Sequence, residues 1–295
     1  MYKIFIVGSI NTDLVITSPY MPKSGETLTG SNFFTAHGGK GANQAVAAAR
    51  LGGNVVMCGC VGNDSFGDDA LKSLQKEGID VSHIRRIEGV STGTAVIIVV
   101  DGDNRIILDK GANAYLSKAD IDGVLMDAKE GDIYLTQLEN PIDVIGYGLM
   151  KAKEKGLKVI LNPAPANKEI EKYLQFCDII TPNETELELL GGKDELLKIV
   201  PTVVTTLGGR GYEITDKNGS KVYPCIKIEP VDTTAAGDTL CGGMAMGLEK
   251  GELLADAVKF GSTAASIACT KMGAQPSIPT KEEVENFCFG KTTPR

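Results

Sequence analysis

The sequence predicts an α/β protein with a doubly wound, mostly parallel sheet flanked by helices, and a smaller β-sheet beside it. Short apolar runs recur along the chain, and each ends in a polar or glycine-rich segment that leads into a helical pattern. This is the order of repeated βα units. Two β-rich stretches, at about 12–36 and 91–111, interrupt the alternation. We expect them to meet in one small sheet outside the main one.

The predicted main strands are short and apolar. The first, Ile4 to Val7, has no polar face, as expected for a strand that helices cover on both sides. Five more follow: Asn54 to Val61, Ile133 to Gln137, Lys158 to Leu161, Asp178 to Thr181 and Thr202 to Leu207. Doubly wound sheets bind their ligands at the carboxyl ends of the strands. The polar segments that follow these strands therefore predict a site there.

Helical spacing of apolar residues separates the strands. It predicts one helix from about residue 42 that ends at Gly52-Gly53, others over Ser65–Lys76 and up to residue 155, and a last one at about 280–289 before a frayed tail. Leu240, Met244 and Leu248 recur every fourth residue in a late helix. In the two interruptions, the short segments 14–17, 27–29, 94–100 and 105–108 are predicted strands, and Asp101-Gly102-Asp103-Asn104 is a hairpin turn.

Composition excludes several classes of function. The net charge is −8 and no run of Lys or Arg occurs, which argues against a nucleic-acid partner. No apolar segment is long enough to cross a membrane, and the amino terminus continues into a core strand, so we expect no signal peptide. The seven cysteines are scattered, and Cys58 and Cys60 have no second pair for zinc. Buried, reduced thiols in a cytoplasmic protein account for them.

The two histidines offer little material for catalysis or for a metal site. Neither His37 nor His83 has a Gly-x-Ser-x-Gly motif nearby, so a Ser-His-Asp triad is not expected. His83 follows a turn and is predicted at the surface. His37 adjoins a glycine pair and could line a site as part of its wall.

The late helix begins with a candidate phosphate site, in the segment Asp232 to Thr239. Its Ala235-Ala236-Gly237 turn has side chains too small to cover the backbone. Free N–H groups at a helix start, with the helix dipole behind them, bind anions. Asp238 follows directly and could accept the proton of an alcohol that receives a phosphoryl group. The simpler alternative is a helix N-cap on a glycine turn.

The segment Gly38-Gly39-Lys40-Gly41-Ala42-Asn43-Gln44 opens the first helix. It matches neither the Walker A spacing nor the Gly-x-Gly-x-x-Gly dinucleotide pattern. Small residues at the helix entrance, with Lys40 and Asn43 projecting from it, suit a polyhydroxyl ligand that approaches the backbone closely. A helix that merely packs tightly on the sheet is the alternative.

Together with Thr181-Pro182-Asn183-Glu184 and Gly273-Ala274-Gln275-Pro276-Ser277, these segments resemble the ribokinase-like (PfkB) carbohydrate and nucleoside kinase family over essentially the whole chain. The resemblance implies one α/β domain over 1–295 and ATP-dependent phosphorylation of the 5-hydroxyl of D-ribose. It implies that Asp238 is the base and that the amides of Ala235, Ala236 and Gly237 stabilise the transferring phosphate. The two β-rich insertions correspond to a lid that often pairs two subunits into a homodimer.

The resemblance also assigns ligand-binding positions, which match this sequence residue by residue. Sugar-binding positions are Asn11, Asp13, Gly38, Gly39, Lys40, Gly41, Asn43, Glu139 and Asp238. ATP-binding positions are Asn183, Thr206, Leu207, Gly208, Gly209, Arg210, Gly211, Gly237 and Ser262. Glu186 would hold Mg²⁺ through water, although a solvated helix face is its alternative. A K⁺ site would comprise Asp232, Thr234, Ala268, Lys271, Gly273 and Ser277.

Three features depart from the family pattern: Leu240-Cys241 replaces a common Phe-Asn, the 190–201 connection is short, and Ser262 replaces a larger residue. Alternatives therefore stay open. Another sugar or a nucleoside (deoxyribose, fructose or adenosine) could be the substrate, although Asn11 and Asp13 together favour a small pentose. A nicotinamide-dependent oxidoreductase lacks its glycine motif here. A non-catalytic sugar sensor would not need Asp238.

Overall fold

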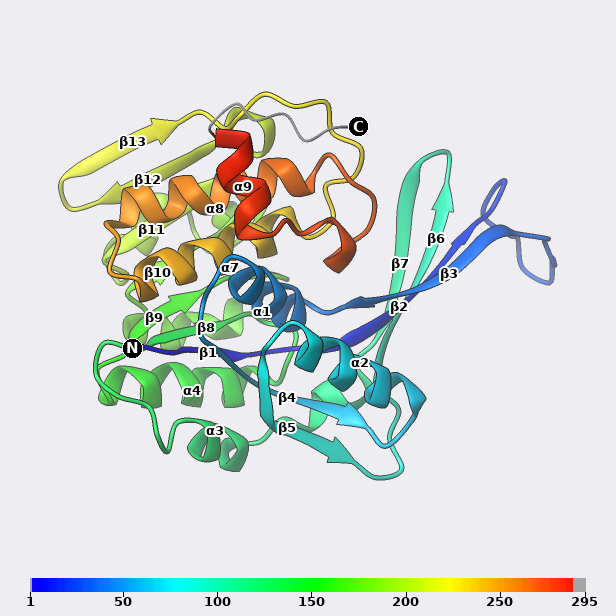
Figure 1. The fold of residues 1–295 in the computed structure, drawn as a ribbon, viewed down its shortest axis with the longest axis horizontal. Helices are drawn as coiled ribbons and strands as arrows, with labels where there is room; N and C mark the ends of the chain where they lie inside the picture. The colour runs from blue at the N-terminus through cyan, green and yellow to red at the C-terminus, as the bar shows by residue number, and fades with distance from the viewer. Residues whose placement is uncertain (1, 289–295) are drawn as a thin grey trace.

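A nine-stranded sheet runs through the centre of the molecule, and a four-stranded sheet projects from one side (Figure 1). The computed structural model describes residues 2–288. The main sheet has the order β13-β12-β11-β10-β9-β8-β1-β4-β5. Its strands are β1 (Ile4–Val7), β4 (Val55–Gly62), β5 (Asp80–Ile87), β8 (Ile133–Thr136), β9 (Lys158–Leu161), β10 (Ile179–Ile180), β11 (Thr202–Thr206), β12 (Tyr212–Asp216) and β13 (Gly219–Tyr223).

The sheet is parallel from β5 to β11, and β12 alone runs against the other strands, since it pairs antiparallel with both β11 and β13. From β1 the chain builds outward through β4 to β5, then returns to place β8 on the other side of β1. The reversal between β1 and β8 is the topological switch point, where doubly wound sheets form their ligand crevice. The predicted fold class is confirmed.

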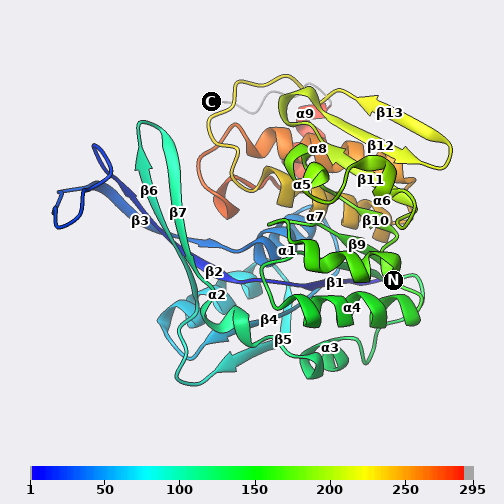
Figure 2. The same ribbon diagram turned by 180° about the vertical axis from the view of Figure 1, so that it is seen from behind.

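Helices cover both faces of the sheet (Figures 1 and 2). On one face, α1 (Lys40–Arg50), α2 (Ser65–Lys76), α7 (Ala236–Glu249) and α8 (Leu254–Ala268) share a core with Ile4 and Ile6. On the other face, α3 (Lys118–Val124) and α4 (Ile142–Glu154) share a core with Phe5 and Val7. The helices α5 (Glu184–Leu189), α6 (Lys193–Leu196) and α9 (Lys281–Cys288) complete the described chain.

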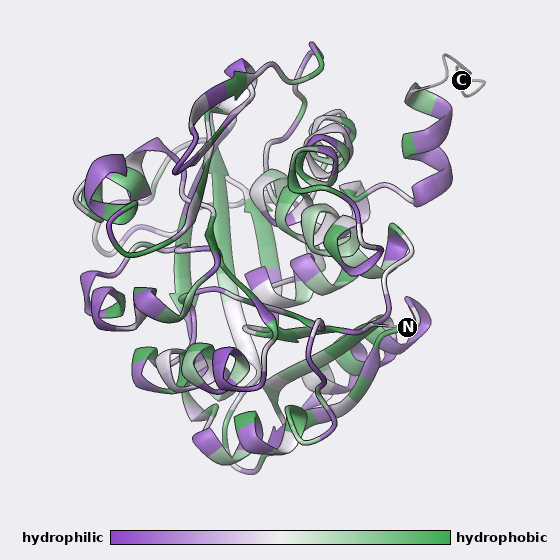
Figure 3. Ribbon diagram, turned by 90° about the vertical axis from the view of Figure 1, so that its left-hand side faces the viewer, coloured by the Kyte–Doolittle hydropathy of each residue, from purple (hydrophilic) through white to green (hydrophobic). Residues whose placement is uncertain are grey.

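Alternate residues of β1 thus point into two separate cores, as the pleat of a strand requires. Figure 3 shows the same division: the central strands are apolar, and the outward faces of the helices are hydrophilic. Burial on both faces explains why the strands have no polar side in the sequence.

The small sheet has the order β3-β2-β6-β7 and comprises β2 (Asn11–Thr17), β3 (Ser31–Gly38), β6 (Gly93–Val100) and β7 (Asp103–Asp109). β2 pairs antiparallel with β3 and parallel with β6, and both pairings place Asn11 at the base of the sheet. Because only three residues separate β1 from β2, the base of the small sheet lies at the carboxyl end of β1. Asn11 and Asp13 therefore belong to the small sheet.

Several details of the prediction need correction. Residues 27–29 are not a strand, because the pairing of β3 with β2 begins only at Ser31. Strand β5, the β12–β13 hairpin, and helices α3 and α8 were not predicted. The last helix spans Lys281–Cys288, while the predicted tail after it lies outside the described residues. Between residues 2 and 288, none of the helices combines the length and apolar character needed to span a bilayer.

Candidate active site

Asp238 lies at the amino end of α7, and its side chain is 6% exposed. Helix α1 packs directly against α7. The approach is so close that a Cβ atom at Gly242 of α7 would lie 2.6 Å from the Gln44 carbonyl oxygen of α1. Only a glycine allows this approach, and the approach brings the first turn of α1 to Asp238. Two segments almost two hundred residues apart in the sequence thus form one site.

Two amide groups from α1 bind the Asp238 carboxylate. The side-chain N–H groups of Asn43 and Gln44 each donate to one of its oxygens at 3.0 Å. Burial raises the pKa of Asp238 above its usual value, while Lys40 and these two amides act in the opposite direction. A buried carboxylate with a raised pKa is suited to accept a proton.

Further buried amides fix the orientation of Gln44. The Gln137 side-chain amide donates to the Gln44 side-chain carbonyl at 2.6 Å. The Gln44 amide nitrogen, in addition to its bond with Asp238, donates to Asn162 Oδ1 at 3.2 Å. Since the Gln44 carbonyl is already an acceptor, its NH₂ group must face Asp238. The Asn43 side-chain oxygen is buried and has no hydrogen-bond partner among the described residues. It is therefore available to accept a bond from a ligand hydroxyl.

The Asn11 amide is oriented by Asn113, which lies between β7 and α3. Asn113 donates to Asn11 Oδ1 at 2.7 Å and to the Ile10 carbonyl at 3.1 Å, and it accepts from the Ile10 amide at 2.9 Å. The NH₂ group of Asn11 consequently remains free to donate to a ligand. Asp13 follows on the same face of β2, where burial and then Glu139 raise its pKa to about 6.

Glu139 joins the carboxyl ends of β1 and β8 to the start of α1. It accepts from the Ser9 hydroxyl and from the Lys40 backbone N–H, the latter at 3.2 Å. Burial alone would lower the pKa of Lys40, but the Asp238 and Glu139 carboxylates outweigh it and raise that pKa. The lysine therefore stays cationic between two carboxylates.

Glycines bring this backbone close together. A Cβ at Gly38 would lie 2.5 Å from the Asp13 carboxylate, and one at Gly41 would lie 2.6 Å from the Gly8 backbone. Gly39 adopts φ 87°, in the left-handed region, and a Cβ there would lie 2.8 Å from backbone atoms of Ser9 and Asn11. The sequence Gly38-Gly39-Lys40-Gly41 is thus required by close packing as well as by any ligand.

Two adjoining cavities meet at the start of α7. The smaller, about 210 Å³, contains Lys40, Asn183, Glu186 and Asp238. The larger, about 440 Å³, lies between β11, the loop before α7 and α8. Thr206, Thr233, Ala236 and Gly237 line both. A ligand in the larger cavity could therefore extend a group toward Asp238.

Most of the residues assigned to ATP from sequence line these cavities, and two do not. Thr206, Gly208, Gly209, Gly211, Gly237 and Ser262 line the larger one, and Asn183 the smaller one. Leu207 and Arg210 line neither, and Arg210 forms an ion pair with Glu184. The cavity wall also includes Cys225, Ile226 and Ile228, which the sequence did not indicate.

Asn183 and Glu186 form a capping box at the start of α5. The Asn183 side chain accepts from the Glu186 N–H, and the Glu186 carboxylate accepts from the Asn183 N–H, both at 2.8 Å. Burial raises the pKa of Glu186, which faces the smaller cavity and is not on a fully solvated helix face. Its second oxygen is available to a ligand.

The turn before α7 supplies two free amides. Ala235 is left-handed, with φ 60°, and Ala236 starts the helix. The Ala236 N–H donates to the Thr233 carbonyl at 3.2 Å, while the Ala235 and Gly237 N–H groups have no partner among residues 2–288. Two of the three predicted amides are therefore free for an anion.

The residues assigned to a K⁺ site lie on two loops that hydrogen bonds hold together. Asp232 accepts from Thr234 through one oxygen and from the Gly273 N–H through the other, at 2.9 Å. The Ala268 carbonyl accepts from the Lys271 N–H, and the Lys271 ammonium pairs with Glu283. Lys271 can thus offer only its carbonyl, and Ser277, which donates to Ala274, retains a free oxygen lone pair.

A doubly wound sheet with a buried carboxylate in a polar cavity, and a larger cavity that adjoins it at free helix amides, has the features that an α/β phosphotransferase needs. Comparison with known proteins makes this specific. The model of the pfkB family carbohydrate kinases matches residues 1–281. The chain therefore belongs to the PfkB family of carbohydrate kinases.

Individual relatives support the same family assignment. Ribokinase of Haemophilus influenzae is 43% identical and covers 96% of this chain and 97% of its own length. Deoxyribokinase of Salmonella typhimurium is 34% identical, with 96% and 98% covered. The structure of Arabidopsis thaliana ribokinase complexed with ribose and ATP superposes with a TM-score of 0.86, at 30% identity, and covers 97% of this chain and 98% of that one.

Four residues of the site were missed by sequence reasoning: Gln44, Asn113, Gln137 and Asn162. Each is buried and binds another site residue. Gln137 and Asn162 end predicted strands or follow them directly, and that position is the signal that could have indicated them. Asn113 lies in a 3₁₀ turn, Gly111–Tyr115, after the small sheet and carries no comparable signal.

Proposed function

We propose that this protein transfers the γ-phosphoryl group of ATP to the 5-hydroxyl of D-ribose, giving D-ribose 5-phosphate and ADP. The observation that carries the proposal is the place of Asp238 in the polar cavity, directly after Ala236 and Gly237, which line the larger cavity as well. A sugar hydroxyl on one side and a terminal phosphate on the other would both reach it. The full-length similarity to ribokinases supports this choice.

The sugar would bind between the base of the small sheet and the start of α1. Asn11 donates through its NH₂ group, Asp13 accepts through its carboxylate, and Asn43 accepts through its unpartnered oxygen. A polyol both donates and accepts, and this set offers both functions. Gly39, Lys40 and Glu139 complete the wall of the sugar site.

Asp238 acts as the base, receiving the hydroxyl proton as the phosphoryl group arrives. The free Ala235 and Gly237 amides, with the dipole of α7 behind them, stabilise the charge on the transferring oxygens. Asp238→Asn should lower kcat by about 10²–10⁴-fold, the usual range for a positioned base. Unchanged turnover would show that the base is misassigned.

ATP would occupy the larger cavity, with its phosphates at the start of α7 and near Asn183. Mg²⁺ neutralises phosphate charge when it is bound, and Glu186 suits it because one carboxylate through water is how Mg²⁺ usually binds proteins. Within residues 2–288 no cluster of three or more His, Cys, Asp or Glu could hold a metal. This fits an ion held mainly by phosphates and water.

K⁺ would bind beside the start of α7, through Asp232, Thr234 and the carbonyls of Ala268, Lys271 and Gly273, with Ser277. Asp232 has a pKa lowered by its bonds to Thr234 and Gly273, despite burial, and stays ionised. A cation there would fix the loop that leads into Ala235. The test is turnover in K⁺ against an organic cation of equal ionic strength.

The small sheet would act as a lid that excludes water from the phosphoryl group. It exposes large apolar side chains, among them Phe33 at 64% and Ile107 at 69%. We propose that a second copy of the chain covers them in a homodimer. Ile107→Asp should then yield a monomer in analytical ultracentrifugation. The free cysteines suit the reducing cytoplasm, where we place the protein.

The decisive experiment is a substrate panel of ribose, deoxyribose, fructose and adenosine with ATP. We expect the highest kcat/KM for ribose. Deoxyribose is the second candidate, because a deoxyribokinase matches nearly the whole chain. A strong preference for adenosine would overturn the proposal, and sugar binding without turnover would restore the sensor hypothesis.

A further inference from the structure

A second polar cavity lies behind the small sheet, between β2, β3 and helix α2. It has a volume of about 410 Å³, within the range of small-molecule sites. Side chains alternate across a strand, so Thr12 points to the opposite face of β2 from Asn11 and Asp13. Its cross-strand partner is His37. The back pocket, defined by Thr12, Thr35, His37, Ser73 and Lys76, is therefore separate from the sugar site.

Two buried polar atoms beside the back pocket lack partners. Thr12 is 4% exposed, and neither its hydroxyl oxygen nor His37 Nδ1 has a hydrogen-bond partner among residues 2–288. A buried polar group without a partner destabilises the folded state, so such groups call for an explanation. Both belong to side chains that line the same cavity, which points to a ligand there.

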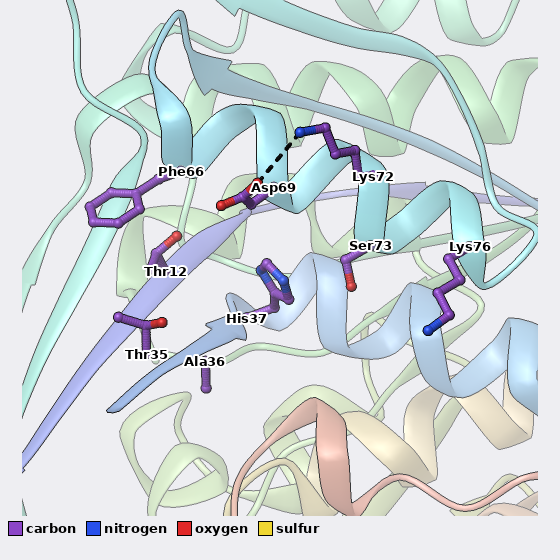
Figure 4. Close-up of a pocket in the computed structure, with 9 residues that line it drawn as sticks. All are labelled: Thr12, Thr35, Ala36, His37, Phe66, Asp69, Lys72, Ser73 and Lys76. Carbon is purple, nitrogen blue, oxygen red and sulfur yellow. Dashed lines mark ion pairs between the residues drawn. The ribbon is translucent and has the colours of Figure 1, made fainter. Parts of the chain in front are cut away.

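The cavity is also lined by two lysines, Lys72 and Lys76, and by one carboxylate, Asp69, so positive charge predominates in its wall. The ion pairs that α2 makes within the described chain are Lys72 with Asp69, at 3.7 Å, and Asp68 with Arg86. Lys76 is left without a carboxylate. Figure 4 shows Ser73 and Lys76 extending from α2 toward the side of His37, whereas Lys72 lies along the helix with Asp69. Lys76 thus lines the same pocket as three hydroxyl groups and an imidazole.

We propose that the back pocket binds a small phosphorylated polyol, such as a sugar phosphate. Lys76 binds the phosphate as a point charge, and the Thr12, Thr35 and Ser73 hydroxyls with His37 bind the sugar hydroxyls. Thr12 lies between Asn11 and Asp13 in β2, and His37 directly precedes Gly38 in β3. Occupation therefore fixes the base of the small sheet and tightens sugar binding on its other face, a consequence that rests on the proposed function.

Histidine NMR tests the binding directly, because the sequence contains only His37 and His83. Full-length protein with isotope-labelled histidine is titrated with D-ribose 5-phosphate and with inorganic phosphate, and His83→Gln assigns the signals. We expect saturable His37 shifts with both. Lys76→Ala should weaken both by about tenfold or more, as expected for losing a charged bond. Lys217→Ala, an equal change of charge in the exposed β12–β13 turn, should change neither.

The outcomes separate the parts of the proposal. No saturable shift, or shifts that persist in Lys76→Ala, would overturn it and leave water as the partner of Thr12 and His37. Equal affinity for both probes would overturn the polyol part, since the hydroxyls would contribute nothing. The ribose Kd, measured by calorimetry with and without phosphate in wild type and Lys76→Ala, tests the coupling. A phosphate-independent Kd would refute it, whether or not the protein phosphorylates ribose.

Discussion

Gln44 should set the protonation of Asp238, the proposed catalytic base, and Gln44→Met tests this. Methionine has a similar length and volume but cannot donate. The Gln44 bond to Asp238 is one of two equal bonds of 3.0 Å. A hydrogen bond to a charged group contributes about 1.5–3 kcal/mol. Because one pKa unit corresponds to about 1.4 kcal/mol, its loss should raise the Asp238 pKa by about one to two units.

The sign of the effect on activity follows from the base mechanism. Only the ionised Asp238 can accept the hydroxyl proton, so activity is lost as the pH falls through its pKa. Burial has already raised that pKa. In Gln44→Met the acidic limb of the single-turnover rate should therefore move to higher pH by about one to two units. The rate should recover at high pH, where Asp238 ionises in both proteins.

The matched control is Gln175→Met, in which an exposed glutamine that donates only to a backbone carbonyl is replaced. It should leave the profile unchanged. Gln44→Met also leaves the Gln137 NH₂ group and the Asn162 side-chain oxygen without a partner, which should lower the free energy of unfolding by about 1–3 kcal/mol per group. Urea unfolding measures that loss separately. A uniform drop in rate with an unmoved acidic limb would refute the reasoning.

Three further variants test the site. In the wild type the ribose KM should rise as the pH falls below about 6, because Asp13 becomes protonated there. Asp13→Asn should abolish this rise, and an identical KM profile in the variant would exclude an ionised Asp13 from sugar binding. Gly39→Ala should lower Tm and raise KM more than Gly78→Ala, whose glycine has φ 78° but open space around it; equal losses would mean that only φ matters. Gly237→Ala should keep or raise Tm and reduce turnover, and normal turnover would contradict close phosphate binding there.

The sequence indicated the fold well where burial leaves a plain pattern. Strands such as Ile4–Val7 and Ile133–Thr136 are buried on both faces, so they appear as short, mainly apolar runs. Strand β5 does not: only Ile84 and Ile87 are buried, and two exposed arginines stand between them at the sheet edge. Edge strands need fewer apolar residues, and the pattern therefore hides them.

The site shows the same limit. Residues with distinctive backbone roles, such as Gly39 and Asp238, lie in short motifs that a sequence displays. Asn113 acts through three hydrogen bonds to Ile10 and Asn11, about a hundred residues away. Only the packing of β1 and β2 against the turn after β7 brings them together. An asparagine in a turn is also common for local reasons, so nothing in the sequence separates this role from the ordinary one.

The start of α7 indicates how the fold reserves space for a phosphate. Ala235 is held in a left-handed conformation, which costs an alanine about 1–2 kcal/mol. Two residues later, Gly237 has a free N–H and no neighbour that a Cβ would contact, although alanine would stabilise a helix by up to about 1 kcal/mol. Packing therefore does not require glycine at this position. A methyl group at Gly237 would enter the junction of the two cavities beside Asp238. We therefore infer that glycine is needed here to keep that junction open.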